Sequence, residues 1–78
     1  MKVYVTVYEH RHGTDVLVFD SRAKAEAWRT EIAIQWWENE FSGEPKPGDD
    51  TIADVYFERM ADAVGQGEFF NIYESNVE

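Results

Sequence analysis

The sequence predicts an α+β fold with the element order β-β-α-α-β. Its sheet has three strands, an N-terminal antiparallel hairpin plus a C-terminal strand, and two helices pack on one face. Two observations predict this fold. β-branched and aromatic residues alternate with period two near both ends of the chain, and apolar residues recur at helical spacing in two segments between them. A chain of 78 residues can bury one thin core, so we expect residues 1–78 to form a single domain.

The first two strands are predicted at residues 1–9 and 15–20, where apolar side chains alternate between two faces. Gly13, in the connection, can adopt the positive φ that a short hairpin loop needs. We therefore expect an antiparallel hairpin. A third strand is predicted over residues 68–74, and the sequence leaves open which edge of the hairpin it joins.

The first helix is predicted over Ser21–Phe41, the longest segment without glycine or proline, which contains all three tryptophans. Ser21 is expected to be its N-cap. Two apolar stripes run along this helix: Ala25, Trp28, Ile32 and Trp36 form the first, and Ile34, Trp37 and Phe41 form the second. One stripe is enough to cover a core. The second is therefore either buried by another element or left for a partner.

The second helix follows residues 43–50, which hold two glycines and two prolines and favour an exposed connection. We expect Asp49 or Asp50 to cap this helix, and Gly65 and Gly67 to end it. Its buried face is predicted to consist of Ile52, Tyr56, Met60 and Ala63, with Ala53, Phe57 and Val64 at the border. On the opposite side Asp54, Glu58 and Asp62 recur every four residues and form an acidic row.

The net charge of −9 comes entirely from residues 38–78, which contain eleven acidic residues and two basic ones. Such a field repels nucleic acid and attracts basic surfaces, although acidic surfaces also serve solubility alone. Direct nucleic-acid binding is not expected. Tyr4, Tyr8 and Tyr73 could share a sheet face for stacking bases, but the seven basic residues are too few and too scattered to bind phosphates.

The hairpin end is the densest polar cluster, with His10 and His12 between Glu9 and Asp15. Two imidazoles and a carboxylate can contribute to a metal site, but a third and fourth rigid ligand are not evident. We expect a polar hairpin end in which His12 or Asp15 bonds to loop amides, with no metal and no cofactor. The chain has no cysteine, no phosphate-binding glycine loop and no evident nucleophile, so we expect no enzymatic activity.

Protein binding is the function class that remains. The residues expected to contact a partner combine carboxylates with one aromatic anchor: Glu38, Glu44, Asp49, Asp50, Asp54, Glu58, Asp62 and Trp37. Glu68 is expected to add to the same acidic surface. Carboxylates presented to a basic groove can occupy the places of phosphates. The alternative is an accessory domain that forms a homodimer by burying Trp37 and its neighbours.

Several motifs together resemble a group of short acidic proteins of phages, plasmids and bacterial genomes. They are the hairpin residues His10, His12, Gly13 and Asp15, the pair Trp36 and Trp37, and the run Tyr56, Phe57 and Glu58. Small acidic phage proteins of this size include anti-CRISPR inhibitors, which bind effector complexes and often block DNA access. This similarity implies an inhibitor that docks its acidic residues into a basic nucleic-acid channel. No apolar run approaches the ~20 residues of a membrane span, and no signal pattern opens the chain, so the bacterial cytoplasm is the expected location.

Overall fold

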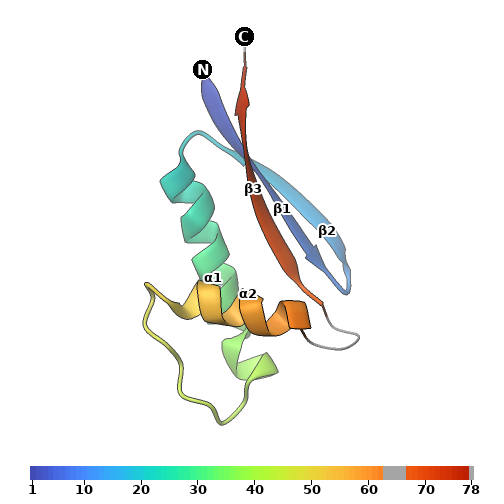
Figure 1. Ribbon diagram of the computed structural model, residues 1–78, viewed down its shortest axis with the longest axis vertical. Helices are drawn as coiled ribbons and strands as arrows, with labels where there is room; N and C mark the ends of the chain where they lie inside the picture. The colour runs from blue at the N-terminus through green and yellow to red at the C-terminus, as the bar shows by residue number, and fades with distance from the viewer. Residues whose placement is uncertain (63–66, 78) are drawn as a thin grey trace.

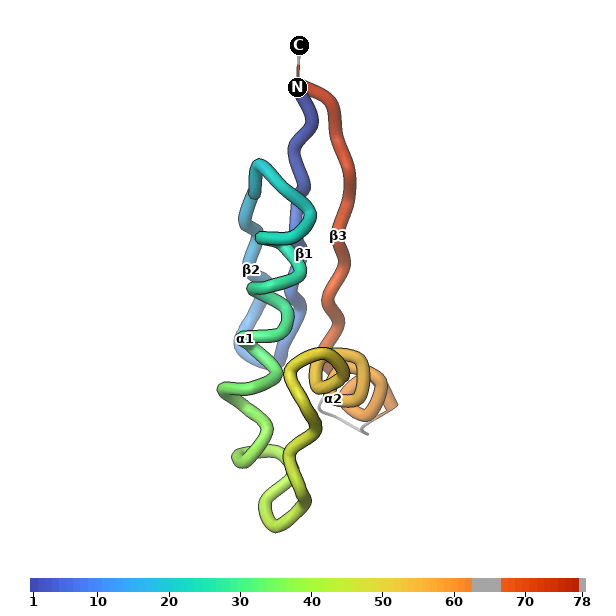
Figure 2. The backbone as a smooth tube through the Cα atoms, turned by 90° about the vertical axis from the view of Figure 1, so that its left-hand side faces the viewer, coloured from blue at the N-terminus to red at the C-terminus, as the bar shows by residue number. Residues whose placement is uncertain are grey.

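The computed structural model describes residues 1–62 and 67–77 and confirms the predicted α+β order β-β-α-α-β. One antiparallel sheet of order β2-β1-β3 contains β1 (Lys2–His10), β2 (Gly13–Phe19) and β3 (Phe69–Asn76). Helices α1 (Arg22–Glu40) and α2 (Ile52–Asp62) lie on the same side of this sheet (Figures 1 and 2). The third strand joins the free edge of β1, so β1 is central, and Met1 and Val77 are hydrogen-bonded to each other at one end of the sheet.

The hairpin forms as predicted, with only two residues between β1 and β2. Gly13 has a φ of 135° and pairs with His10, so the residue without a Cβ occupies the position where the chain reverses. Directly opposed residues of antiparallel strands point to the same face of the sheet. The face toward the helices therefore carries Thr6 and Tyr8, both buried, and the Thr6 hydroxyl donates to the Leu17 carbonyl at 3.0 Å.

Helix α1 begins as predicted, because the Ser21 hydroxyl accepts a hydrogen bond from the Lys24 amide at 3.2 Å. Its first half lies over β1 and β2, where Trp28 packs with Tyr8 of β1, Phe19 of β2 and Phe70 of β3. Its second half extends past the sheet and crosses α2 (Figure 1). The element that covers α1 thus changes from the sheet to α2 along its length.

Because α2 covers the second half of α1, the buried residues there differ from those predicted. Trp36 was expected in the core and Trp37 on a leftover strip, but Trp37 is 1% exposed and Trp36 is 39% exposed. Trp37 lies between α1 and α2, where it packs against Phe41 and under the Arg59 guanidinium. Its indole N–H donates to the Glu44 carbonyl at 3.3 Å. Of the two alternatives for the second stripe, burial by another element is the one observed: α2 covers Trp37, so the expectation that Trp37 contacts a partner is wrong.

Helix α2 buries the predicted face, Ile52, Ala53, Tyr56, Phe57 and Met60, against α1 and the sheet. The chain enters it through a turn in which the Gly48 carbonyl accepts hydrogen bonds from the amides of Thr51 and Ile52. The Asp49 and Asp50 side chains accept no hydrogen bond from the described amides of this turn, so the predicted aspartate cap is wrong. The predicted end at Gly65, and the positions of Ala63 and Val64, lie outside the described residues.

The two adjacent tryptophans provide a test of this packing. We expect Trp37→Ala to lower the free energy of unfolding by about 3–5 kcal/mol, because it leaves a cavity between the helices and removes a hydrogen bond. Trp36→Ala should cost no more than about 1 kcal/mol, because its side chain is partly in water. Urea unfolding followed by circular dichroism measures both values. Equal losses for the two variants would contradict the described position of α2 on α1.

Candidate functional site

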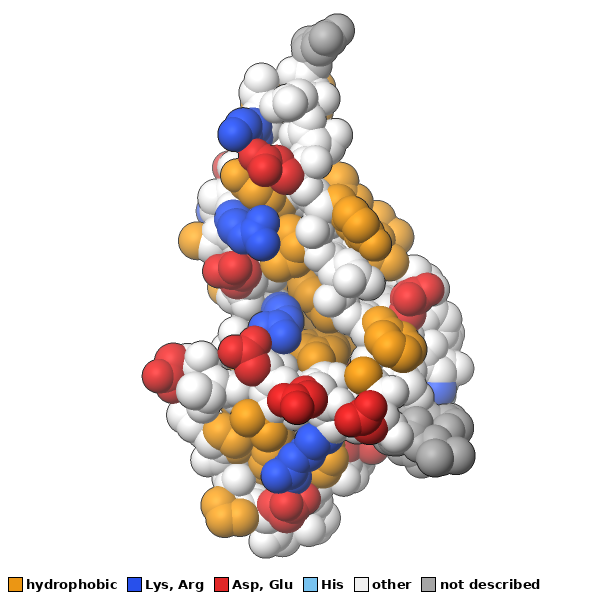
Figure 3. Space-filling view, viewed as in Figure 1, with side chains coloured by type: hydrophobic (Ala, Val, Ile, Leu, Met, Phe, Trp, Pro, Cys, Tyr) orange, Lys and Arg blue, Asp and Glu red, His pale blue; other side chains and the backbone are white. Residues whose placement is uncertain are grey.

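The acidic residues expected to contact a partner are all exposed: Glu38, Glu44, Asp49, Asp50, Asp54, Glu58 and Asp62. Asp54, Glu58 and Asp62 form the predicted row on the outer side of α2, and acidic side chains gather over this helix in Figure 3. The remaining four lie at the end of α1 and along the connection to α2. These carboxylates are therefore spread over the layer formed by α1, α2 and their connection, and they do not converge on one point.

Two of these carboxylates are held by arginines that lie among them. The Arg29 guanidinium donates to Asp54 at 2.8 Å, and the Arg59 guanidinium donates to Glu44 at 2.8 Å. Both arginines also lie over aromatic rings, Arg29 over Phe57 at 5.3 Å and Arg59 over Phe41 at 5.1 Å. The negative field of the helical layer is therefore weakened locally at both positions.

Two residues expected on the partner surface lie inside the protein. Trp37 belongs to the core, so it cannot act as an exposed anchor, and the same burial removes it as the contact of a homodimer. Glu68 was expected to add to the acidic surface but is 8% exposed. Both corrections have one cause, because α2 and the start of β3 fold over positions that have surface character in the sequence.

Glu68 forms a buried cluster with two tyrosines that the sequence did not reveal. Its Oε1 atom accepts hydrogen bonds from the Tyr8 hydroxyl at 2.5 Å and from the Tyr56 hydroxyl at 3.0 Å. Burial raises the pKa of both phenols far above the ordinary value, and the hydrogen bond and negative charge of Glu68 add to the effect. Both tyrosines therefore stay protonated and donate. The cluster links β1, α2 and the start of β3.

The hairpin end is a polar, hydrogen-bonded turn as expected, but the expectation that His12 or Asp15 bonds to its amides is wrong, because the His10 side chain takes this role. His10 Nδ1 accepts from the His12 amide at 3.3 Å, and His10 Nε2 lies 2.9 Å from the Asp15 carboxylate. Because Nδ1 accepts, Nε2 is the nitrogen that carries the proton toward Asp15. Both ring nitrogens are thus engaged within the turn. Among the described residues no group of three or more histidine, aspartate or glutamate side chains could hold a metal ion.

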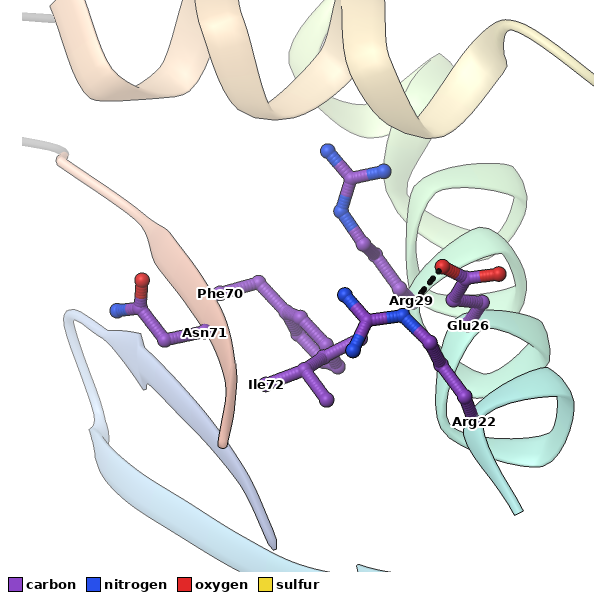
Figure 4. A pocket seen from close by; sticks show the side chains of 6 residues that line it. All are labelled: Arg22, Glu26, Arg29, Phe70, Asn71 and Ile72. Atoms are coloured by element: carbon purple, nitrogen blue, oxygen red, sulfur yellow. Dashed lines mark ion pairs between the residues drawn. The ribbon is translucent and has the colours of Figure 1, made fainter. Parts of the chain in front are cut away.

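Two hollows open on the helix side of the described structure. The smaller, of about 40 Å³, lies between the hairpin end and Trp36 and has room for little more than one water molecule. The larger, of about 240 Å³, lies between α1 and β3 (Figure 4). Arg22, Glu26 and Arg29 of α1 form one wall and Phe70, Asn71 and Ile72 of β3 form the other. Its guanidiniums are already paired, Arg22 with Glu26 at 3.4 Å and Arg29 with Asp54.

The opposite face of the sheet carries a continuous apolar surface that neither helix covers. The register places seven apolar side chains on it, which we call the valine face: Val3, Val5, Val7, Val16, Val18, Phe69 and Tyr73. Val5 lies at the centre, opposite Val18 on one side and Tyr73 on the other. The side chains on the outer strands are largely in water, with Val16 56% and Val18 61% exposed. Hydrophobic side chains line this side of the sheet at the right of Figure 3.

The register also corrects the predicted grouping of tyrosines. Tyr4 lies opposite Glu74, so Tyr73 points to the valine face while Tyr4 and Tyr8 point toward the helices. The alternation of Val3, Val5 and Val7 did indicate a valine stripe on one strand. It did not indicate that both helices would pack on the other face of the sheet. The sequence therefore contained no sign that the valine stripe would remain exposed.

Comparisons of the chain with protein-family models, with curated proteins and with solved structures find no match. In residues 1–62 and 67–77 no helix combines the length and the apolar character that crossing a membrane requires.

The Tyr8–Glu68–Tyr56 cluster predicts a loss of stability at high pH. In the unfolded chain both phenols release their protons near the ordinary pKa of 10.0, whereas the folded chain retains them. The stabilisation is complete below pH 10 and falls as the pH rises above it, by at most about 1.4 kcal/mol per pH unit for each tyrosine. Urea unfolding at successive pH values from 8 to 11.5 measures this slope.

The control for that slope is the double variant Tyr8→Phe and Tyr56→Phe, which keeps both rings and removes both ionisable groups. It should be less stable at pH 8, because Glu68 loses both donors, and should show a shallower decline above pH 10. A decline as steep as that of the wild type would show that other groups cause the pH dependence.

Proposed function

We propose that this protein is a protein-binding module whose binding surface is the valine face. The observation that supports this proposal is that seven apolar side chains lie side by side on a sheet face that neither of the described helices covers. A sheet normally buries one face and exposes a polar one, with apolar and polar residues alternating along each strand. Here the exposed face is apolar on β1 and β2, except at Glu9 and Thr14 next to the hairpin turn, and half apolar on β3. Contiguous exposed patches of this kind mark interaction surfaces.

The hollows on the helix side favour the same conclusion. Pockets for small molecules usually enclose about 300–1,000 Å³ and place a few convergent polar groups against an apolar wall. The groove between α1 and β3 is smaller, at about 240 Å³, and its arginines are engaged in ion pairs. The valine face offers more apolar area than either hollow. It is therefore the surface from which most binding free energy can be obtained.

The acidic row on α2 supports a second candidate function, an anti-CRISPR-like inhibitor. Glu58 and Asp62 project from successive turns of α2 and are exposed, beside Asp54. In this proposal the row enters the basic nucleic-acid channel of an effector complex and blocks access by nucleic acid. The net charge of −9 supports rapid capture by a basic partner. This candidate is secondary because the ion pairs at Asp54 and Glu44 weaken the field of the surface.

Site-specific photo-crosslinking tests the first proposal. A benzophenone residue is placed at Val16 on the valine face and, in a matched control, at Ala23 on the exposed side of α1. Both proteins are illuminated in extract of the cells from which the gene comes, and also after purification. We expect a discrete adduct from position 16 and none from position 23. Absence of any adduct from position 16 in both settings would contradict the proposal.

Charge reversal tests the second proposal. We expect Glu58→Lys with Asp62→Lys to weaken binding to a purified CRISPR effector complex by at least about tenfold, because two attractive charges become repulsive. Raising the salt from 0.1 M to 1 M should weaken wild-type binding, since the screening length falls from about 10 Å to about 3 Å. Surface plasmon resonance measures both effects. The control is Asp20→Lys with Glu31→Lys, which changes the net charge by the same amount at positions outside α2 and should bind almost normally. An equally large loss of affinity in this control would refute a role for the acidic row.

A further inference from the structure

We infer that the partner of the valine face is a second copy of this chain, giving a dimer in which two sheets pack face to face. The inference rests on the proposed function, because it names the partner of the same surface. In such a dimer each copy contributes the same residues, so the contact is isologous and closes after two chains. The two β1 strands lie at the centre, and the four helices lie on the outside of a two-layered sandwich.

The distribution of charge favours a second copy over a different kind of partner. A chain with net charge −9 should select basic partners wherever its own charges are exposed. On the sheet face that bears the valine stripe, the register leaves Glu9 as the one charged side chain among the described residues, at the end next to the hairpin turn. A basic partner would therefore gain little electrostatic attraction at this face. The surface that best complements the valine face is uncharged and apolar, and the valine face of a second copy has these properties.

Charge also determines which faces of two copies can approach. The helical layer carries the exposed acidic residues of α1, α2 and their connection, so two helical layers repel each other. Contact through the sheets keeps these layers on opposite sides of the dimer. The valine face is thus the broad surface by which two copies can meet with the least electrostatic cost.

The shape of the sheet suits this contact. Sheets in sandwiches pack about 10 Å apart at roughly 30°, with the side chains of both inner faces interdigitating. The face presents short branched side chains at its centre, Val3, Val5 and Val7, and larger rings of Phe69 and Tyr73 on β3. Branched side chains are stiff, so little conformational freedom is lost when two such surfaces meet.

The area of the face sets the expected strength of the dimer. Three strands spaced by about 4.8 Å, paired over seven residues of about 3.3 Å, give a footprint of roughly 330 Å² for each copy. A standard stable interface buries about 800 Å² of accessible surface on each partner. The contact is small beside such an interface, so we expect a weak, reversible dimer that dissociates on dilution.

The dimer has a consequence for the acidic surface. Sheets packed face to face place one α2 in each outer layer of the assembly, so a dimer presents Glu58 and Asp62 twice. Self-association and acidic docking also respond to salt in opposite directions. Screening should strengthen the dimer, by reducing repulsion between two acidic chains, and should weaken any contact of the acidic row with a basic partner.

Sedimentation equilibrium of the purified full chain, from 1 to 500 μM, tests the inference. We expect the mass to rise with concentration from 9.1 kDa toward twice that value, and the dissociation constant to fall when salt is raised. Val16→Lys with Val18→Lys should weaken association by at least about 100-fold, because lysine ammonium groups would be buried without partners. Both positions are exposed in one chain, so these substitutions leave the core intact, and circular dichroism checks the fold.

The matched control is Ala23→Lys with Ala27→Lys, which adds the same charge on the exposed side of α1. It should associate at least as well as the wild type. A mass of 9.1 kDa at all concentrations, or equal association of the Val16 and Val18 variant, would overturn the inference. The proposed function would survive if position 16 still crosslinks to a different protein in extract. A monomer that also forms no adduct there would overturn both.

Discussion

The buried carboxylate of Glu68 is the interaction on which the arrangement of this fold depends most. It accepts hydrogen bonds from Tyr8 on β1 and Tyr56 on α2, and its own amide donates to the Met60 carbonyl at 3.3 Å. One residue thus joins the central strand, the second helix and the start of β3. Hydrogen bonds to a charged group contribute about 1.5–3 kcal/mol each, and a buried carboxylate without its donors is strongly unfavourable. The position of α2 is therefore fixed by hydrogen bonds to Glu68 as well as by apolar packing against α1 and the sheet.

Placing α2 in this way divides the molecule into two sides with different physical character. Helix α2 covers the second apolar stripe of α1, so Trp37 becomes core, and the helical layer presents acids and arginines to water. The same docking leaves the other sheet face bare. Both helices of the described residues, α1 and α2, lie on one face of the sheet, and neither covers the other face. The valine face is the side of the sheet left open by this arrangement, and in the proposed function a partner covers it.

The two candidate functions use different surfaces of the molecule and different forces. The valine face acts through the hydrophobic effect, which is short-ranged and little affected by moderate salt. The acidic row acts through long-range attraction that salt screens. The two surfaces do not exclude each other, because the valine face lies on the sheet and the acidic row lies on α2. A dimer joined through its sheets leaves both acidic rows exposed.

The sequence by itself determined the secondary structure of this protein. Period-two alternation predicted the strands, Gly13 and Ser21 predicted the hairpin turn and the start of α1, and the buried face of α2 followed from helical spacing. These features depend on local geometry, and local geometry is encoded in neighbouring residues. Only the tertiary structure decided which tryptophan is buried, that Glu68 leaves the surface, and which sheet face stays open. Each of these depends on contacts between residues far apart in the chain, and periodicity carries no information about which of two apolar faces another element will cover.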